Sequence, residues 1–209
     1  MSKLNLDEII KCLSQIAKTL HEKPEDAIKE LRSISSHVDN QIPYRDGHIL
    51  RVTKYSVAIG KQLGLDEDVM LILETAALLH DYGKIGIDET ILTKPGRLTP
   101  SERKEIEMHT MRGYYILSGF PEFGDALTGV KSHHEKYDGS GYPQALSGEH
   151  IPLIARILAV ADSYDAMTSV RPYRRAKTKE EGIAELQRCA GTEFDPKIVD
   201  AFLRAIKAV

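Results

Sequence analysis

Histidines placed beside carboxylates are the residues of this sequence best suited to chemistry. The chain has eight histidines, and five of them, together with two aspartates, fall on or at the ends of apolar helical faces. These seven residues are His48, His80, Asp81, His109, His133, His134 and Asp162. Neutral imidazole and carboxylate oxygen are ligands for manganese, iron and zinc. Seven such groups converging from helix interiors would hold two metal ions, with a carboxylate bridging them.

Each histidine taken alone could instead be a core residue whose hydrogen bonds are satisfied, and for a single position that is the simpler interpretation. The set as a whole argues otherwise, because burying five imidazoles and two carboxylates without a compensating cation costs several kcal/mol of desolvation. The sequence therefore favours a metal site over seven separate core residues.

The first three of these groups are predicted to lie on two successive helices. A helix that begins near His48 and ends near Gly64 carries that histidine on its apolar face. The next helix spans roughly residues 67–81 and ends in His80-Asp81, with Gly83 expected as its C-terminal cap. The polar pair therefore sits at a helix end.

The other groups fall on later helices. Residues 85–98 hold too many helix breakers and predict a loop with a short turn. Residues 99–102, Thr-Pro-Ser-Glu, supply a capping box with a proline in the first helical position, and so begin a helix that carries His109. A helix from about residue 122 runs into His133-His134, followed by about a dozen irregular residues.

Asp162 lies on a helix predicted from Pro152 to about Thr168. Asp165 lies on the same face of this helix as Asp162. The otherwise apolar face thus carries two carboxylates in its second half, and a carboxylate that points into the protein needs a partner. We expect Asp165 to support the site rather than to bind metal directly.

The fold class predicted from these patterns is all-α, a compact bundle of about nine helices with no strand alternation. Residues 1–40 read as an N-terminal helical hairpin, and a soft boundary near residue 40 separates them from a domain of residues 41–209. The hairpin could mediate dimerisation, dock a partner or be the remnant of a sensory connection, but packing on the same chain is the simplest expectation.

Composition narrows the class of protein. The 209 residues include 28 Lys and Arg against 31 Asp and Glu, a formal net charge of −3, which argues against general DNA or RNA binding. The sequence contains no apolar run of about 18 residues and no readable signal peptide, so we expect a cytoplasmic protein without a membrane span. Cys12 and Cys189 are far apart and predict neither a disulfide framework nor a cysteine metal site.

The ordered histidines and aspartates resemble the metal-binding pattern of the HD superfamily of phosphohydrolases. Residues 133–143, His-His-Glu-Lys-Tyr-Asp-Gly-Ser-Gly-Tyr-Pro, look like the signature of its HD-GYP subfamily, whose members hydrolyse the bacterial second messenger cyclic di-GMP. Residues 161–168, 171–174 and 191–196 are similar to further parts of that family. The resemblance runs from about residue 44 to the C-terminus.

The resemblance implies how the metal ligands divide. His48, His80, Asp81 and Asp162 would hold one ion, and His109, His133 and His134 the second, with Asp81 bridging. Some relatives bind a third ion through a glutamate one turn before the first histidine, but this chain has Tyr44 there, so we expect two ions. Iron or manganese are the ions implied, with zinc or others as alternatives.

The resemblance also implies residues that meet the substrate. Lys84 would stabilise the transition state beside the catalytic Asp81, and Arg171 and Arg174 would hold phosphate. Gly141 and Tyr142 of the Gly-Tyr-Pro loop would contact substrate. Asp138 would orient a ligand histidine. That loop also suggests contacts with cyclic di-GMP synthase domains, and a homodimer is a further expectation.

The function expected from this pattern is a metal-dependent phosphodiesterase that opens cyclic di-GMP to pGpG, and could continue to GMP, by attack of a hydroxide bridging the two metals. Two alternatives stay open at this point. One is an HD phosphohydrolase acting on another nucleotide. The other is a non-catalytic adaptor in cyclic di-GMP signalling.

Overall fold

Regular structure in this computed structural model is helical, and the model describes residues 5–40, 47–170 and 175–207. The α-helices are α1 (Leu6–Thr19), α2 (Pro24–Asp39), α3 (His48–Leu63), α4 (Glu67–Leu79), α5 (Glu89–Leu92), α6 (Pro100–Glu107), α7 (His109–Leu117), α8 (Ala126–Ser132), α9 (Leu153–Thr168), α10 (Lys179–Arg188) and α11 (Pro196–Ile206). Three short 3-10 helices join them, η1 (Tyr82–Gly86), η2 (Pro121–Phe123) and η3 (Gly148–His150). Within the described ranges there is no strand, only one isolated bridge between Ala190 and Phe194. The predicted all-α class is confirmed.

The described part of the chain holds eleven α-helices, so the expected number of about nine was too low. One addition is α5, which forms inside the predicted loop because the Asp88 side chain caps its start by accepting the N–H of Thr90. The other arises because the helix beginning at Pro100 is divided at Met108 into α6 and α7. A further difference concerns α8, whose start was predicted near residue 122. This helix begins at Ala126, after the separate turn η2.

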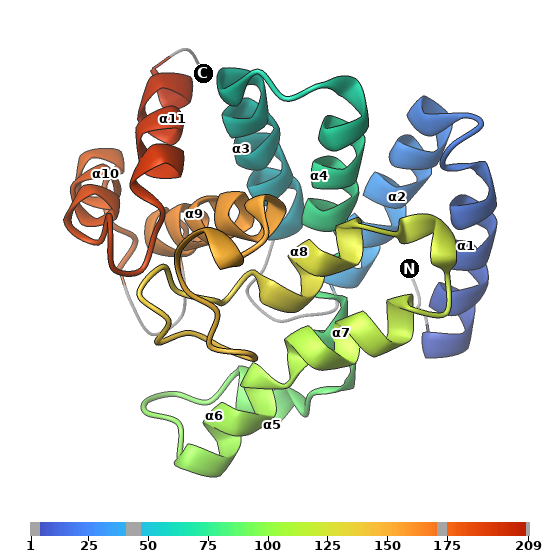
Figure 1. The fold of residues 1–209 in the computed structure, drawn as a ribbon. Helices are drawn as coiled ribbons and strands as arrows, with labels where there is room; N and C mark the ends of the chain where they lie inside the picture. Colours follow the sequence, from blue (N-terminus) through green and yellow to red (C-terminus); the bar gives the residue numbers. More distant parts are fainter. Residues whose placement is uncertain (1–4, 41–46, 171–174, 208–209) are drawn as a thin grey trace.

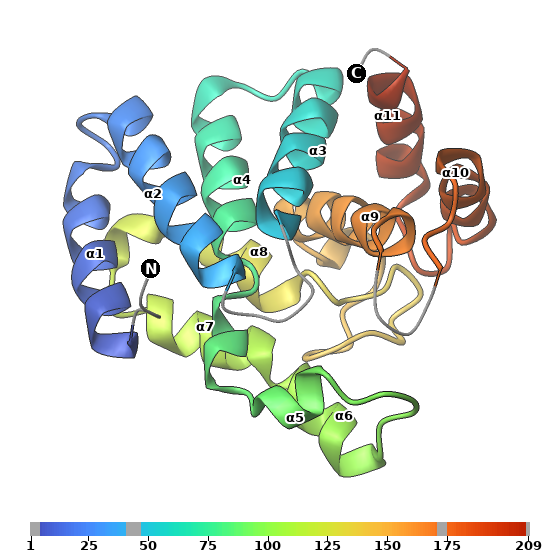
Figure 2. The same ribbon diagram turned by 180° about the vertical axis from the view of Figure 1, so that it is seen from behind.

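The helices form a body with α3, α4 and α9 at its centre (Figure 1). The hairpin α1–α2 lies on one side of this centre and α10–α11 on the other, an arrangement that Figure 2 shows from behind. Helices α5 to α7 project along one edge. None of the helices that the structure describes is both long and apolar enough to cross a membrane.

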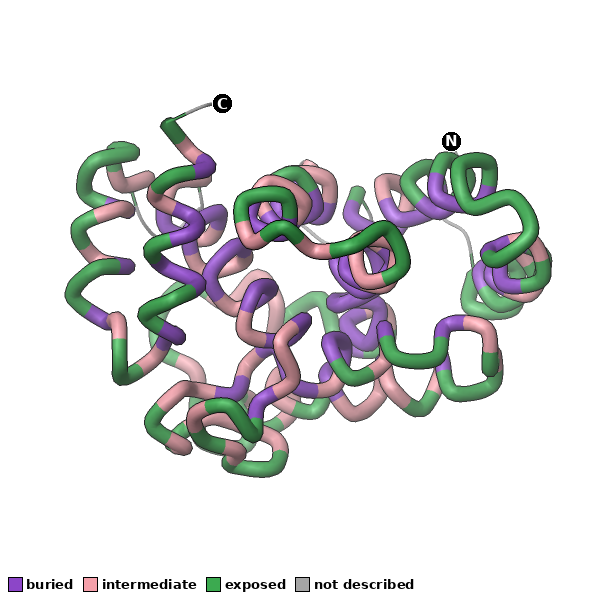
Figure 3. The backbone as a smooth tube through the Cα atoms, turned by 45° about the horizontal axis from the view of Figure 1, so that its top comes forward, coloured by how far each residue is buried: buried purple, intermediate pink, exposed green. Residues whose placement is uncertain are grey.

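Two hydrophobic clusters form the core. One joins α3, α4 and α9 to α10 and α11, and includes Tyr164 and Phe202. The second joins the hairpin to α3, α4, α7 and α8, and includes Leu13, Leu31 and Leu79. Buried stretches accordingly gather toward the middle of the molecule, while the outer turns of the end helices are exposed (Figure 3). The expectation that the hairpin packs on the body of the same chain is confirmed.

Gly83 has a different role from the one predicted. It lies inside η1 rather than capping α4, whose C-cap is His80. A Cβ atom at Gly83 would lie 1.9 Å from the backbone oxygen of His109 and 2.5 Å from the backbone nitrogen of Gly113. The residue must be glycine because η1 and α7 meet backbone to backbone at this point, and this contact holds the His80-Asp81 segment against the helix that begins with His109.

Candidate functional site

Helix ends bring the seven predicted residues together. His48 and His109 are the first residues of α3 and α7, and His80 and His133 are the C-caps of α4 and α8. Asp81 and His134 each follow a C-cap directly, while Asp162 lies within α9. Backbone groups at helix ends need partners other than the helix itself, so side chains there are placed by tertiary contacts.

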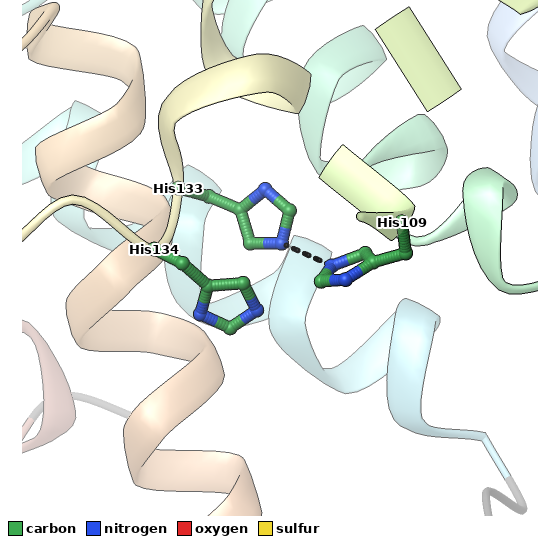
Figure 4. Close-up of side chains that lie close together, drawn as sticks. All are labelled: His109, His133 and His134. Carbon is green, nitrogen blue, oxygen red and sulfur yellow. Dashed lines mark hydrogen bonds between the residues drawn. The ribbon is translucent and has the colours of Figure 1, made fainter. Parts of the chain in front are cut away.

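The ligand-type atoms form two groups. His48, His80 and Asp162 offer one nitrogen or oxygen each within 4.8 Å of one another, and His109, His133 and His134 do the same. Figure 4 shows the second group, whose three rings come from α7 and from the end of α8 and converge on a common space. The division matches the one that the family resemblance implied.

Asp81 lies between the two groups. Its Oδ2 atom is 3.6 Å from Nε2 of His48 and 3.4 Å from Nε2 of His80. Its Oδ1 atom is 3.3 Å from Nε2 of His109 and 3.9 Å from Nε2 of His133. Because each carboxylate oxygen faces a different group, Asp81 has the placement that a bridging ligand requires.

Four imidazoles are oriented by hydrogen bonds from their Nδ1 atoms. These N–H groups donate from His80 to the Ala77 carbonyl (2.7 Å), from His109 to Ile106 (2.6 Å), from His133 to Val130 (2.9 Å) and from His48 to the Asp165 carboxylate (2.7 Å). A proton fixed on Nδ1 leaves the Nε2 lone pair pointing into the site. The site therefore presents a set of nitrogen lone pairs that have already been oriented for a metal.

Two contacts show that this interior suits a cation. The Nε2 atoms of His109 and His133 lie 3.2 Å apart (Figure 4). Because Nδ1 of each ring already donates to a carbonyl, a hydrogen bond between these two nitrogens requires one ring to carry a second proton. His80 Nε2 is buried and makes no hydrogen bond within the described part of the chain. A bound cation would satisfy all three nitrogens, and the donor set of imidazole and carboxylate fits Mn, Fe or Zn.

Burial keeps three of these imidazoles neutral. It lowers the pKa of His133 to about 3, and it holds the pKa values of His80 and His134 well below their usual range. For Asp162 burial acts to raise the pKa, but the surrounding imidazoles and Lys84 outweigh it and leave that pKa well below the ordinary value. Neutral imidazole beside ionised carboxylate is the protonation state that metal binding needs.

Lys84 enters the same site from η1. Its side chain is buried, and Nζ lies 2.6 Å from Oδ1 of Asp81. Lys84 is therefore not a solvent-exposed lysine, the other role that a position just after a helix end allows. A buried ammonium group beside the central carboxylate can reach an anion bound there.

The Gly-Tyr-Pro loop covers the second group of histidines. The Tyr142 ring stacks on His134, with centroids 5.0 Å apart and planes at 30°, and the Tyr142 N–H donates to the His134 carbonyl (3.2 Å). A Cβ atom at Gly141 would lie 2.2 Å from the backbone nitrogen of Lys136, so the loop folds back closely on its own start. Its shape is fixed beside the metal site.

Glu135 braces this loop, a role that the sequence did not reveal. The buried carboxylate accepts the backbone N–H groups of Gln144 (2.7 Å) and Leu146 (3.0 Å). The exposed Asp138, expected to orient a ligand histidine, instead accepts the N–H and hydroxyl of Ser140 at 2.9 and 2.7 Å. Both side chains shape the loop itself.

Asp165 supports His48 as expected, and it does so together with an unpredicted partner. Oδ2 accepts the Nδ1–H of His48, while Oδ1 accepts Nε–H of Arg51 at 2.5 Å and Oδ2 also accepts from Arg51 Nη2 at 3.1 Å. Arg51 lies one turn after His48 on α3, a spacing that could have drawn attention to it. Arg171, Arg174 and Tyr44 lie outside the described residues.

Comparison with known families places this architecture. A family model described as "HD domain" matches residues 15–198. Two solved structures share the fold. A cyclic GMP-AMP specific phosphodiesterase of V. cholerae aligns with a TM-score of 0.68 and 22% identity, covering 86% of this chain and 48% of the other. The HD domain of L. monocytogenes phosphodiesterase PgpH in complex with cyclic-di-AMP aligns with a TM-score of 0.53 and 20% identity, covering 96% and 95%.

Curated proteins are similar at higher identity. The "Cyclic di-GMP phosphodiesterase response regulator RpfG" of Xanthomonas campestris is 46% identical over 83% of this chain and 47% of that protein. A "Cyclic di-GMP phosphodiesterase" of Thermotoga maritima is 38% identical over 94% and 54%. A "3'3'-cGAMP-specific phosphodiesterase 3" of Vibrio cholerae is 37% identical over 81% and 37%. This chain thus spans about half, or less, of the length of these relatives.

Proposed function

Because this chain belongs to the HD domain family, we propose that it is a metal-dependent phosphodiesterase that opens cyclic di-GMP to the linear dinucleotide pGpG. The observation that carries this function is the placement of Asp81 between two groups of three ligands. The substrate class is supported by relatives named as cyclic di-GMP phosphodiesterases at 46% and 38% identity.

The residues divide the work of holding two ions. One group (His48, His80, Asp162) would hold the first ion and the other (His109, His133, His134) the second, with Asp81 shared. A pair of divalent cations supplies Lewis-acid stabilisation of phosphate charge and activates water for attack on phosphorus. We propose that both ions are iron or manganese, which suit this set of nitrogen and oxygen donors, with zinc as the alternative.

Lys84 supplies positive charge from the protein. Its buried ammonium group, 2.6 Å from Asp81, would donate hydrogen bonds to the phosphoryl oxygens as negative charge develops on them. The loop contributes shape, since the Tyr142 ring fixes His134 on one side and Gly141 lets the backbone fold back closely. We propose that Gly141 and Tyr142 contact the bound substrate. On the family resemblance, we also propose that Arg171 and Arg174 bind its phosphate groups.

A second candidate substrate is 3'3'-cGAMP, because one relative at 37% identity is named as specific for it. The two substrates differ in one base, so the metal site cannot distinguish them. The adaptor hypothesis is disfavoured, because all seven ligand positions are occupied by residues able to bind metal.

Further proposals concern the partners and the domain organisation of this chain. The same loop is the surface that would meet a cyclic di-GMP synthase domain, and a homodimer remains a proposal. The division at residue 40 also stays a prediction. The family match begins at residue 15, within α1, and the hairpin shares a hydrophobic cluster with the rest of the chain.

The direct experiment incubates protein reconstituted with iron or manganese under anaerobic conditions with cyclic di-GMP, 3'3'-cGAMP and cyclic di-AMP in parallel, and separates the products by chromatography. We expect pGpG from cyclic di-GMP. Lys84→Met should retain its metal but lose about a hundredfold or more in kcat. The control Lys94→Met removes an ion pair between the residues after α5 and Glu102 of α6, and it should leave kcat unchanged. Binding of cyclic di-GMP without turnover would favour the adaptor, and preferred turnover of another nucleotide would correct the substrate.

A further inference from the structure

A cavity outside the metal site lies beside α4 and α8, two helices whose C-terminal ends lead to metal-site residues. Its volume is about 410 Å³, within the range of pockets that hold small molecules. It is formed where the end of α1 meets η2, in the segment between α7 and α8 that runs beside α1 in both ribbon views (Figures 1 and 2). Residues 68–75 of α4 and the start of α8 complete its wall.

This cavity is separate from the metal site. Thr75 is the lining residue of α4 nearest to the metal site, and the same helix reaches His80 five residues later, about 7.5 Å further along at 1.5 Å per residue. Ala126, at the start of α8, also lines it, whereas the metal-site histidines follow the other end of that helix. None of the seven ligand-type residues contributes to its lining.

The cavity combines an apolar wall with an acidic rim. Leu71, Ile72 and the buried ring of Phe123 supply the apolar surface. The rim is acidic, with three carboxylates and no lysine or arginine in the lining, and these carboxylates belong to Asp68, Glu122 and Asp125. Within the residues that the structure describes, none of the three forms an ion pair.

His21 lies at one side of this rim, where it contacts a backbone carbonyl rather than a carboxylate. Its Nε2–H donates to the backbone carbonyl of Glu122 at 3.0 Å, which ties the turn after α1 to η2. The rim therefore has the electrostatic character of a cation site, and repulsion by three carboxylates excludes anions.

The hydroxyl of Thr75 lies in a deeply buried part of the cavity lining. Thr75 is only 1% exposed, and its hydroxyl makes no hydrogen bond within the described part of the chain. A helical threonine in such a place normally donates to the carbonyl four residues earlier. Its hydroxyl is thus left to serve as donor or acceptor for something that enters the cavity.

We propose that this cavity binds a small organic cation, a protonated amine or guanidinium carried on a short apolar body. The apolar part would pack on Leu71, Ile72 and Phe123, and the charged group would lie among the rim carboxylates. The size of the cavity, which α4, α8, η2 and the end of α1 surround, fits a small molecule. This assignment is independent of the proposed phosphodiesterase activity.

The test is calorimetric titration of the full-length, metal-loaded chain with n-hexylamine, and with 1-hexanol and hexanoate as uncharged and anionic analogues of the same length. We expect one saturable site for hexylamine and weaker binding of both analogues. The double variant Asp68→Asn/Asp125→Asn should weaken hexylamine binding roughly tenfold, since it removes two exposed charges.

A matched control removes two carboxylates elsewhere. Glu25→Gln/Asp26→Asn changes the exposed first turn of α2, outside the cavity lining, and should leave the affinity for hexylamine unchanged. Absence of saturable hexylamine binding, equal affinity for hexanol, or equal weakening in the control variant would each overturn the proposal.

Discussion

Asp165→Asn is the substitution that tests most sharply how the site is held in place. Asp165 is buried, and its two oxygens accept from Nδ1 of His48 and from Arg51. Burial acts to raise the pKa of this carboxyl, but the hydrogen bonds from His48 and Arg51 outweigh it and the pKa is lowered. The residue is therefore an ionised carboxylate serving two donors at once.

An asparagine cannot serve both donors. Its single oxygen can accept from His48 or from Arg51, and in either orientation its amide group faces a donor. The loss of one charge-assisted hydrogen bond amounts to about 1.5–3 kcal/mol, and Arg51, whose side chain is 39% exposed, can recover part of that from water. We expect the free energy of unfolding of the metal-free protein to fall by about 2 kcal/mol, and metal affinity to fall by about 10–100-fold because His48 loses its orientation.

Asp195→Asn is the matched control. Asp195 is equally buried and accepts from Arg156 at 2.5 Å and from the N–H of Lys197 at 2.8 Å, but it contacts none of the seven site residues. Denaturant unfolding of chelator-treated protein measures stability, and titration with manganese measures affinity. The two variants should lose similar stability, and Asp165→Asn alone should lose metal affinity. Equal affinity in Asp165→Asn and the wild type, or equal weakening in both variants, would refute this account of His48.

Three further predictions concern the packing and protonation of the site. Gly83→Ala would place a Cβ atom 1.9 Å from a backbone oxygen of α7, so it should cost about 1–3 kcal/mol of unfolding free energy and weaken metal binding, whereas Gly86→Ala, which meets nothing within 4 Å, should do neither. Ser35→Ala leaves the buried Tyr82 hydroxyl without its 3.1 Å partner and should cost about 1–3 kcal/mol in thermal or denaturant unfolding, a loss that the added change Tyr82→Phe should largely reverse. Burial lowers the pKa of His133 to about 3, so the unfolded chain binds a proton below about pH 6.5 that the folded chain does not bind. The metal-free protein should therefore lose stability as pH falls from about 7 to about 4. His133→Gln should reduce that slope but not abolish it, because His80 and His134 contribute in the same direction, and an unchanged slope would show that His133 is not buried as described.

Local signals in the sequence predicted helix starts well. The capping box predicted at Thr99–Glu102 is present with both reciprocal hydrogen bonds. The same four-residue pattern at Thr178–Glu181 forms a second capping box. Such caps depend on four consecutive residues, so the sequence contains all the information they need. The apolar periodicity likewise identified which faces turn inward, and hence the seven residues that meet at the site.

The sequence did not predict the features that depend on contacts between residues far apart in the chain. The break at Met108 separates α6 from α7 where the backbone at His109 approaches Gly83, and nothing local marks it. Arg51 meets a carboxylate 114 residues away, and periodicity indicates a face without naming its partner. Glu135 braces a loop whose path no pattern specifies.

The central claim, that seven side chains hold a pair of metal ions, is tested most directly by the metal content of the anaerobically purified chain. Elemental analysis after gel filtration should give two firmly bound ions per chain in the wild type, and almost none in Asp81→Ala, which lacks the carboxylate that faces both groups. One ion or three in the wild type, or a full complement in Asp81→Ala, would contradict it.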